Sequence, residues 1–189
     1  MTAAAYTLSE FITDLRGIAA DTKEHEQIIT RVIPLAKRMA VSEDWLDKRY
    51  YACDPEQGFG VHLLHEEPDH TLAVIAVARL PHRATPPHNH GTWAVVVGVD
   101  GPERYTFWKR LDDGTRVGYA EITQIGARVI SPSGIARFLP PQIHSVDNET
   151  NEVTLSLHVY GKHINFTGRS QFDPETNTET PFSVKQEPH

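Results

Sequence analysis

The sequence predicts a mainly β protein, an antiparallel β-barrel or sandwich, with a helical layer at its N-terminus. Three observations predict this fold. Apolar residues recur at helical spacing up to about residue 50. From Gly58 onward, short apolar runs alternate with turns rich in Gly, Pro, Asn and Asp. The length of 189 residues fits one domain, so we expect a helical layer over residues 1–50, a barrel over 58–169 and a C-terminal arm over 170–189.

Two main helices are expected in the N-terminal layer. The stretch TLSE at residues 7–10 matches a capping box, and apolar residues follow it at helical spacing. A second such run covers residues 28–36 and contains Pro34, a residue type that bends or divides helices. Ser42 offers a cap for a short third helix through Leu46. We interpret the whole layer as packing structure.

Nine strands are expected after this layer. Each is a short apolar or alternating run, and the separating stretches, such as VDGPE and LDDGTR, contain turn residues. The polar, proline-containing tail is expected to form an extended arm over the surface or to be partly disordered. The expected strands cover residues 60–66, 71–80, 93–99, 104–111, 119–126, 127–132, 135–140, 144–148 and 153–161.

The composition argues against several classes of protein. No run approaches the ~20 apolar residues of a membrane span and no secretory signal is recognisable, so we expect a cytoplasmic protein without a membrane partner. The net charge of −7 and the absence of a dense Lys/Arg cluster argue against nucleic-acid binding. The single cysteine, Cys53, excludes a cysteine-rich metal site, whereas the 11 histidines favour nitrogen ligands for a metal.

The first pattern with chemical meaning is the pair His88 and His90 in the stretch PPHNHGTW. On a strand, residues two apart leave the same face, so both imidazoles can reach one ion. A histidine pair of this kind is weak on its own.

The second pattern is the alternation of Ser156, His158 and Tyr160 in LSLHVYG. The three side chains share one face of a strand, where a hydroxyl, an imidazole and a phenol can hydrogen-bond in sequence and orient a proton donor. The alternative is a strand with a polar, solvent-facing side.

Two longer stretches resemble the two motifs of the cupin superfamily. They are HNHGTWAVVVGVDG, which ends at Gly101, and GIARFLPPQIHSVDN, which contains His144. The resemblance implies a double-stranded β-helix, that is, a small antiparallel β-barrel, in which His88, His90 and His144 converge on one metal. Residues 92–95 lack the glutamate ligand that the first motif usually carries. Three neutral imidazoles would leave the +2 charge uncompensated and favour an anionic substrate on the metal.

Together with the Ser-x-His-x-Tyr strand, these motifs resemble the thiol dioxygenases, the family of cysteine dioxygenase and 3-mercaptopropionate dioxygenase. The resemblance covers about residues 58–169. It implies a mononuclear non-haem Fe(II), a thiol bound through sulfur, and insertion of both atoms of O₂ to give a sulfinate. Tyr160 would be the active-site tyrosine, with His158 and Ser156 as its relay.

The sequence departs from cysteine dioxygenase in two places. The cysteine that cross-links to the tyrosine in some members corresponds to about Val95 here, so no cysteine–tyrosine cross-link is expected. The strand around GFGVHLL lacks the arginine that binds the substrate carboxylate. Arg169 instead falls where the 3-mercaptopropionate branch carries its carboxylate-binding arginine, although the glutamine of that branch is missing near Val61. Trp93 is expected to pack on the metal pocket, with plain core packing as an equal alternative.

The sequence therefore favours an Fe(II)-dependent thiol dioxygenase that oxidises a small mercapto-carboxylate, either 3-mercaptopropionate-like or cysteine. The expected partners are a small thiol and O₂, and the oligomeric state stays open. One alternative is another three-histidine cupin dioxygenase that cleaves a carbon–carbon bond of a diketone-like substrate without a thiol. The other is a non-catalytic metal-binding cupin.

Overall fold

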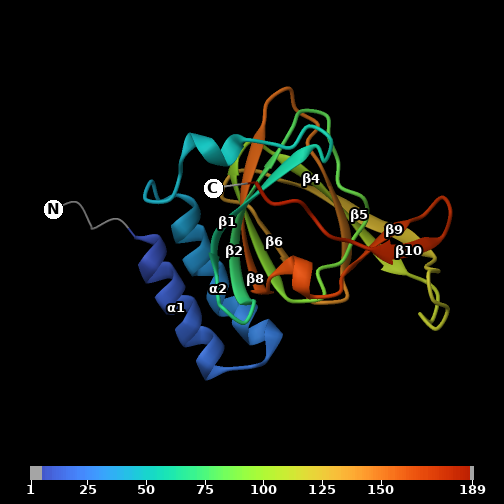
Figure 1. Ribbon diagram of the computed structural model, residues 1–189, viewed down its shortest axis with the longest axis horizontal. Coiled ribbons are helices and arrows are strands. Elements are labelled where there is room, and N and C mark those ends of the chain that lie inside the picture. Colours follow the sequence, from blue (N-terminus) through green and yellow to red (C-terminus); the bar gives the residue numbers. More distant parts are fainter. Residues whose placement is uncertain (1–5, 188–189) are drawn as a thin grey trace.

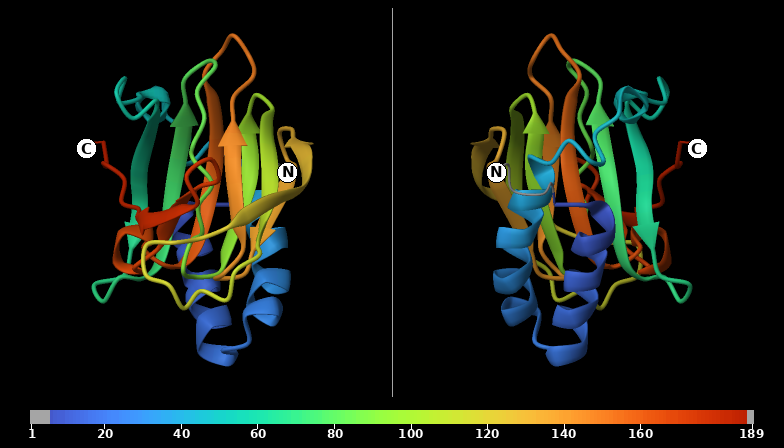
Figure 2. Two further views of the ribbon diagram at one scale, coloured as in Figure 1. Left: turned by 90° about the vertical axis from the view of Figure 1, so that its right-hand side faces the viewer. Right: turned by 90° about the vertical axis from the view of Figure 1, so that its left-hand side faces the viewer.

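The computed structural model of the protein describes residues 6–187. The first five residues of the expected helical layer and the last two of the expected arm lie outside the described residues. Two helices lie together against one side of a β structure (Figure 1), and the two side views in Figure 2 show them covering one sheet.

The two expected helices are present as α1 (Leu8–Asp21) and α2 (His25–Ala40). The capping box is confirmed, because the Thr7 side chain accepts from the Glu10 amide while the Glu10 carboxylate accepts from the Thr7 amide. Pro34 lies inside α2 without dividing it. No helix in residues 6–187 is long and apolar enough to cross a membrane.

The expected short helix after Ser42 is wrong. The Ser42 hydroxyl donates to the carbonyl of Tyr6 at 2.7 Å and accepts from the Asp44 amide, so it fixes a turn against α1. A single 3₁₀ turn, η1 (Lys48–Tyr51), follows instead, with the Asp47 side chain accepting from the Arg49 amide.

The strands form antiparallel sheets rather than one continuous barrel within the described part of the chain. The larger sheet has the order β1-β2-β8-β3-β6, and a three-stranded sheet has the order β5-β4-β7. The strands of the larger sheet are β1 (Phe59–Glu66), β2 (Thr71–Arg79), β3 (Ala94–Asp100), β6 (Ile135–Phe138) and β8 (Thr154–Lys162). The smaller sheet contains β4 (Glu103–Arg110), β5 (Ile122–Ile130) and β7 (Ile143–Asp147).

Two of the expected strands, residues 119–126 and 127–132, form the single strand β5. Gly126 does not end it, because β5 pairs with β4 on both sides of a register shift at Phe107 and Trp108. The expected arm contains a two-stranded hairpin of β9 (Ser170–Asp173) and β10 (Thr178–Pro181), followed by an extended segment.

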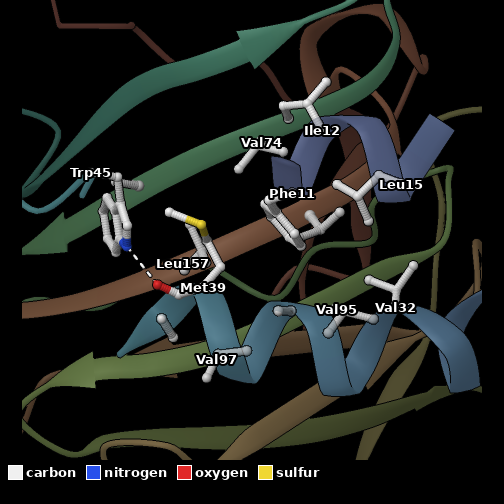
Figure 3. Close-up of a cluster of buried hydrophobic side chains, with 14 of the residues drawn as sticks. Phe11, Ile12, Leu15, Val32, Met39, Trp45, Val74, Val95, Val97 and Leu157 are labelled. Carbon is white, nitrogen blue, oxygen red and sulfur yellow. Dashed lines mark hydrogen bonds between the residues drawn. The ribbon is translucent and has the colours of Figure 1, made fainter. Parts of the chain in front are cut away.

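Side-chain alternation along β2, β3 and β8 produces two cores. One face of these strands packs against the helices in a hydrophobic cluster (Figure 3). Trp45 belongs to this cluster and donates from its indole nitrogen to the Met39 carbonyl. The cluster also includes Val74, Val95, Val97 and Leu157 from the strands and Phe11, Leu15, Val32 and Met39 from the helices. The intervening residues face the space between the two sheets. The chemistry-bearing side chains of β8 belong to this second face.

Candidate metal centre

The three histidines of the cupin-like motifs meet in the second core. His88 and His90 lie in an extended segment before β3, not in a regular strand as expected, and His144 lies in β7. Two backbone hydrogen bonds join His88 to His144, at 2.9 and 3.0 Å. Gly91 turns the chain with a φ of +64°, and a Cβ there would lie 3.0 Å from Thr167. The glycine thus allows the segment to turn from His90 into β3.

The geometry of the cluster fits a single transition-metal ion. One ring nitrogen from each histidine lies within 4.8 Å of the others, and all three residues are buried. The Nδ1–H of His88 donates to the carbonyl of Pro86 at 2.8 Å, which leaves Nε2 with a free lone pair. The Nδ1 atoms of His90 and His144 are buried without a hydrogen-bond partner among the described residues. A set of buried nitrogens without partners is suited to binding a cation.

Burial keeps these imidazoles neutral. It lowers the pKa of His88 to about 3, and the positive charge of Arg169 acts in the same direction. Burial also lowers the pKa of His90 and of His144 well below the ordinary value of histidine. Neutral imidazole is the form that ligates a metal, so the site needs no deprotonation step at pH 7.

Ser156, His158 and Tyr160 form the hydrogen-bonded chain that their alternation predicts. The Ser156 hydroxyl lies 2.9 Å from Nε2 of His158, and Nδ1 of His158 lies 2.7 Å from the Tyr160 hydroxyl. Burial lowers the pKa of His158 to about 3, so its ring is neutral and carries one proton. Burial raises the pKa of Tyr160, which therefore keeps its hydroxyl proton. The Tyr160 ring packs edge-on against His90, with 5.1 Å between ring centroids.

Arg169 brings a positive charge into the same cavity. Its Nε donates to the carbonyl of Phe182 at 3.2 Å, whereas its Nη2 is buried with no hydrogen-bond partner among the described residues. Burial lowers the pKa of Arg169 to about 10, so the guanidinium remains charged at neutral pH. A buried guanidinium with an unused donor is a binding group for a carboxylate.

The cavity that joins these groups is small and has two kinds of wall. Its volume is about 40 Å³. The polar wall consists of His88, His90, His144, His158, Tyr160 and Arg169. The apolar wall includes Phe59, Val61, Val77, Ile164, Phe182 and Val184. We therefore expect a ligand with one anionic end and an apolar body.

Trp93 does not line this cavity, so the expectation that it packs on the metal pocket and binds substrate is wrong and the alternative of plain core packing holds. It belongs to the hydrophobic cluster under the helices, together with Val95 and Val97. The reason is the strand period of two, because Ala94 and Val96 face the site and the odd-numbered residues face away. Cys53 also packs against the helix-side cluster.

The sequence did not predict one wall of the site or a buried ion pair outside the lining of the cavity. Phe182 and Val184 lie in the tail that was expected to cross the surface or be partly disordered, although apolar residues in a polar tail were a usable signal. A buried ion pair between Arg79 and Glu103 also went unnoticed; the carboxylate accepts from Arg79 at 3.3 Å and from Thr154 at 2.8 Å. Nothing in the local sequence distinguishes these charges from surface ones.

No protein-family profile matches the chain. Among solved structures, an oxalate oxidase in complex with the substrate analogue glycolate is similar at 17% identity, with a TM-score of 0.47 over 62% of this chain and 59% of that one. A protein with a double-stranded β-helix domain from Klebsiella pneumoniae has 14% identity and a TM-score of 0.45 over 68% and 96% of the two chains. A cupin domain of a transcriptional regulator from Enterobacter cloacae has 16% identity and a TM-score of 0.40 over 57% and 99%. The chain spans 52% to 61% of the length of the three oxalate oxidase chains.

Proposed function

We propose that the protein is a three-histidine metal-binding cupin that acts as a thiol dioxygenase. The substrate is a small mercapto-carboxylate, and the balanced reaction is RS⁻ + O₂ → RSO₂⁻. Fe(II) is the proposed metal, held by His88, His90 and His144.

The observation that carries this proposal is the meeting of three different groups in one buried cavity. The cluster of neutral imidazoles supplies ligands for a metal, the phenol of Tyr160 supplies a hydrogen-bond donor, and the guanidinium of Arg169 supplies a partner for a carboxylate. A diketone would offer the buried, unpaired Nη2 of Arg169 a carbonyl or enolate oxygen, whereas a carboxylate can pair with the guanidinium through two oxygens. This unused donor favours a carboxylate-bearing substrate.

Each protein group has a separate task in the proposed reaction. Bound Fe(II) supplies the redox chemistry that lets O₂ react with the thiolate. Arg169 holds the carboxylate and so fixes the distance of the sulfur from the histidines. The neutral ring of His158 orients the Tyr160 hydroxyl, which can donate a hydrogen bond to charge that develops on the substrate or oxygen. The apolar wall excludes water from the reacting sulfur.

An oxygen electrode tests the proposal directly. The purified chain, loaded with Fe(II), is given 3-mercaptopropionate, cysteine, mercaptosuccinate and cysteamine in turn. We expect O₂ uptake that depends on a carboxylated thiol and matches the sulfinate formed, and we expect none from the His144→Ala variant or the zinc-loaded protein. Absence of thiol-dependent uptake with all four thiols, at full iron loading, would contradict the proposal. Uptake with a diketone and no thiol would favour carbon–carbon cleavage instead.

A further inference from the structure

The C-terminal segment of residues 182–187, which we call the strap, lines one side of the cavity through Phe182 and Val184. In Figure 1 it runs in red from β10 back across the molecule toward β1. The Glu187 amide donates to the carbonyl of Val61 in β1 at 2.9 Å, and Val184 exchanges two hydrogen bonds with the Asn165 side chain. Lys185 forms ion pairs with Asp54 and Glu56, both at 3.1 Å. The strap is thus held along its whole length.

Within the strap, Phe182 touches both functional ends of the cavity. Its ring lies 4.2 Å from the guanidinium carbon of Arg169 and 5.2 Å, centroid to centroid, from the ring of His88. Its amide donates to the Arg169 carbonyl at 3.0 Å, and its own carbonyl accepts from Arg169 Nε at 3.2 Å. Stacking and hydrogen bonding together fix the plane of the guanidinium and leave Nη2 unpaired.

The same ring limits the space beside Arg169. The cavity volume of about 40 Å³ accommodates only a few water molecules, since one water needs ~10–15 Å³ on this measure. Phe59, Phe182 and Val184 also line a neighbouring surface hollow of about 480 Å³, so these three side chains separate the two spaces. The Phe182 ring therefore limits how much of a carboxylic acid fits beside Arg169.

We propose that Phe182 is a specificity-determining residue, which positions Arg169 and restricts the site to acids with a short carbon chain. This inference rests on the proposed function in one respect, since it takes the ligand to be a carboxylate bound by Arg169. Removing the ring would enlarge the pocket and loosen the guanidinium. Longer acids would gain affinity, and the shortest would lose it.

Calorimetric binding of straight-chain acids tests this proposal without any thiol chemistry. Propanoate, pentanoate and heptanoate are titrated into the full chain, the Phe182→Ala variant and the Phe166→Ala variant. Phe166 is the matched control, because it is 48% exposed and does not line the cavity. We expect the wild-type and control proteins to prefer propanoate, and Phe182→Ala to bind heptanoate more tightly than the wild type by about fourfold for each additional methylene buried.

Two further variants keep the test decisive. Phe182→Leu, a smaller truncation, should give an intermediate preference even if Phe182→Ala folds poorly, and general destabilisation would not change the ratio of the affinities. Arg169→Ala should abolish binding of all three acids. The proposal is overturned if the Phe182 variants keep the wild-type ratio, if Arg169→Ala binds as well as the wild type, or if the wild type binds none of the acids. A shifted ratio in a protein that oxidises no thiol would sustain this proposal and refute the proposed function.

Discussion

Tyr160 and His158 share one hydrogen bond, and the direction of that bond decides what the tyrosine can do. When Nδ1 of His158 carries the ring proton, it donates to the phenol oxygen and the Tyr160 proton is free for a ligand in the cavity. In the other tautomer the phenol donates to His158 and the ring donates to Ser156. The tautomer of His158 therefore decides whether the phenol donates to a ligand or to His158, and all three side chains are neutral in both arrangements.

Replacing Tyr160 with Phe is expected to lower kcat by about 100-fold, because the donor to the reacting ligand is lost. Iron content should stay at the wild-type level, since the three histidines do not change. The unfolding free energy should fall by about 1 kcal/mol, because Nδ1 of His158 loses its buried partner. Initial rates of O₂ uptake and metal analysis check this, with Tyr119→Phe, outside the cavity, as the control. Wild-type activity in Tyr160→Phe would refute a role in proton donation.

Replacing Arg169 with Ala is expected to raise KM for 3-mercaptopropionate far more than KM for cysteamine, which has no carboxylate. KM for 3-mercaptopropionate should rise about tenfold or more, because a charge-assisted hydrogen bond contributes at least ~1.5 kcal/mol to binding. Arg169→Lys should recover part of it, since lysine keeps the charge but not the two-pronged geometry. Steady-state kinetics with both thiols measure this. Equal increases in KM for 3-mercaptopropionate and cysteamine would mean that another residue binds the carboxylate.

For single residues, side-chain alternation along a strand correctly predicted which face each side chain occupies. The period of two places Ser156, His158 and Tyr160 on one face. The same period places Trp93 on the opposite face, so its closeness to His90 in the sequence did not predict its position in the fold. Phe182 could not be predicted, because its position depends on how the strap folds back.

Strand β8 carries the side chains of Ser156, His158 and Tyr160, and Gly161 determines how closely Trp93, just before β3, approaches this strand. A Cβ at Gly161 would lie 2.2 Å from Nε1 of Trp93, so only glycine lets the indole lie against β8. Helices and strand ends were predictable where local patterns decide them, as the capping box before α1 shows. The expected helix over residues 42–46 is absent, and the Ser42 hydroxyl donates instead to the carbonyl of Tyr6, which precedes α1.

Replacing Gly161 with Ala is expected to lower the unfolding free energy by about 1–3 kcal/mol, because the added methyl group overpacks the contact with Trp93. Urea unfolding, followed by tryptophan fluorescence, measures the change. Gly126→Ala is the matched control, since a Cβ there meets nothing within 4 Å and Gly126 is also in a strand. Equal stabilities of the two variants would show that the indole does not need this space.

The molecule as a whole buries an unusual number of neutral imidazoles in one core, and this makes its stability depend on pH. His88 and His158 have a pKa of about 3 when folded, against about 6.5 when unfolded. Between these values the unfolded chain binds more protons than the folded chain, so stability falls as the pH falls. The distant parts of the chain that create this core could not be paired from the sequence alone.

For the metal-free protein, we expect the unfolding free energy to decrease steadily from pH 7 to pH 5, by up to about 1.4 kcal/mol per pH unit for each such histidine. Urea titrations at several pH values measure the slope. His158→Gln should reduce this slope, because it removes one buried neutral imidazole. A flat profile over this range would mean that the cluster is not buried in the neutral form.

In the proposed function, one metal ion joins the three histidines and faces Tyr160 and Arg169. Anomalous diffraction from crystals of the Fe(II)-loaded protein with 3-mercaptopropionate, kept free of O₂, tests it most directly. We expect a single iron peak about 2.1 Å from a nitrogen of each of His88, His90 and His144, with the thiol sulfur beside it and the carboxylate on Arg169. An iron peak away from these nitrogens, or a substrate outside this cavity, would contradict it.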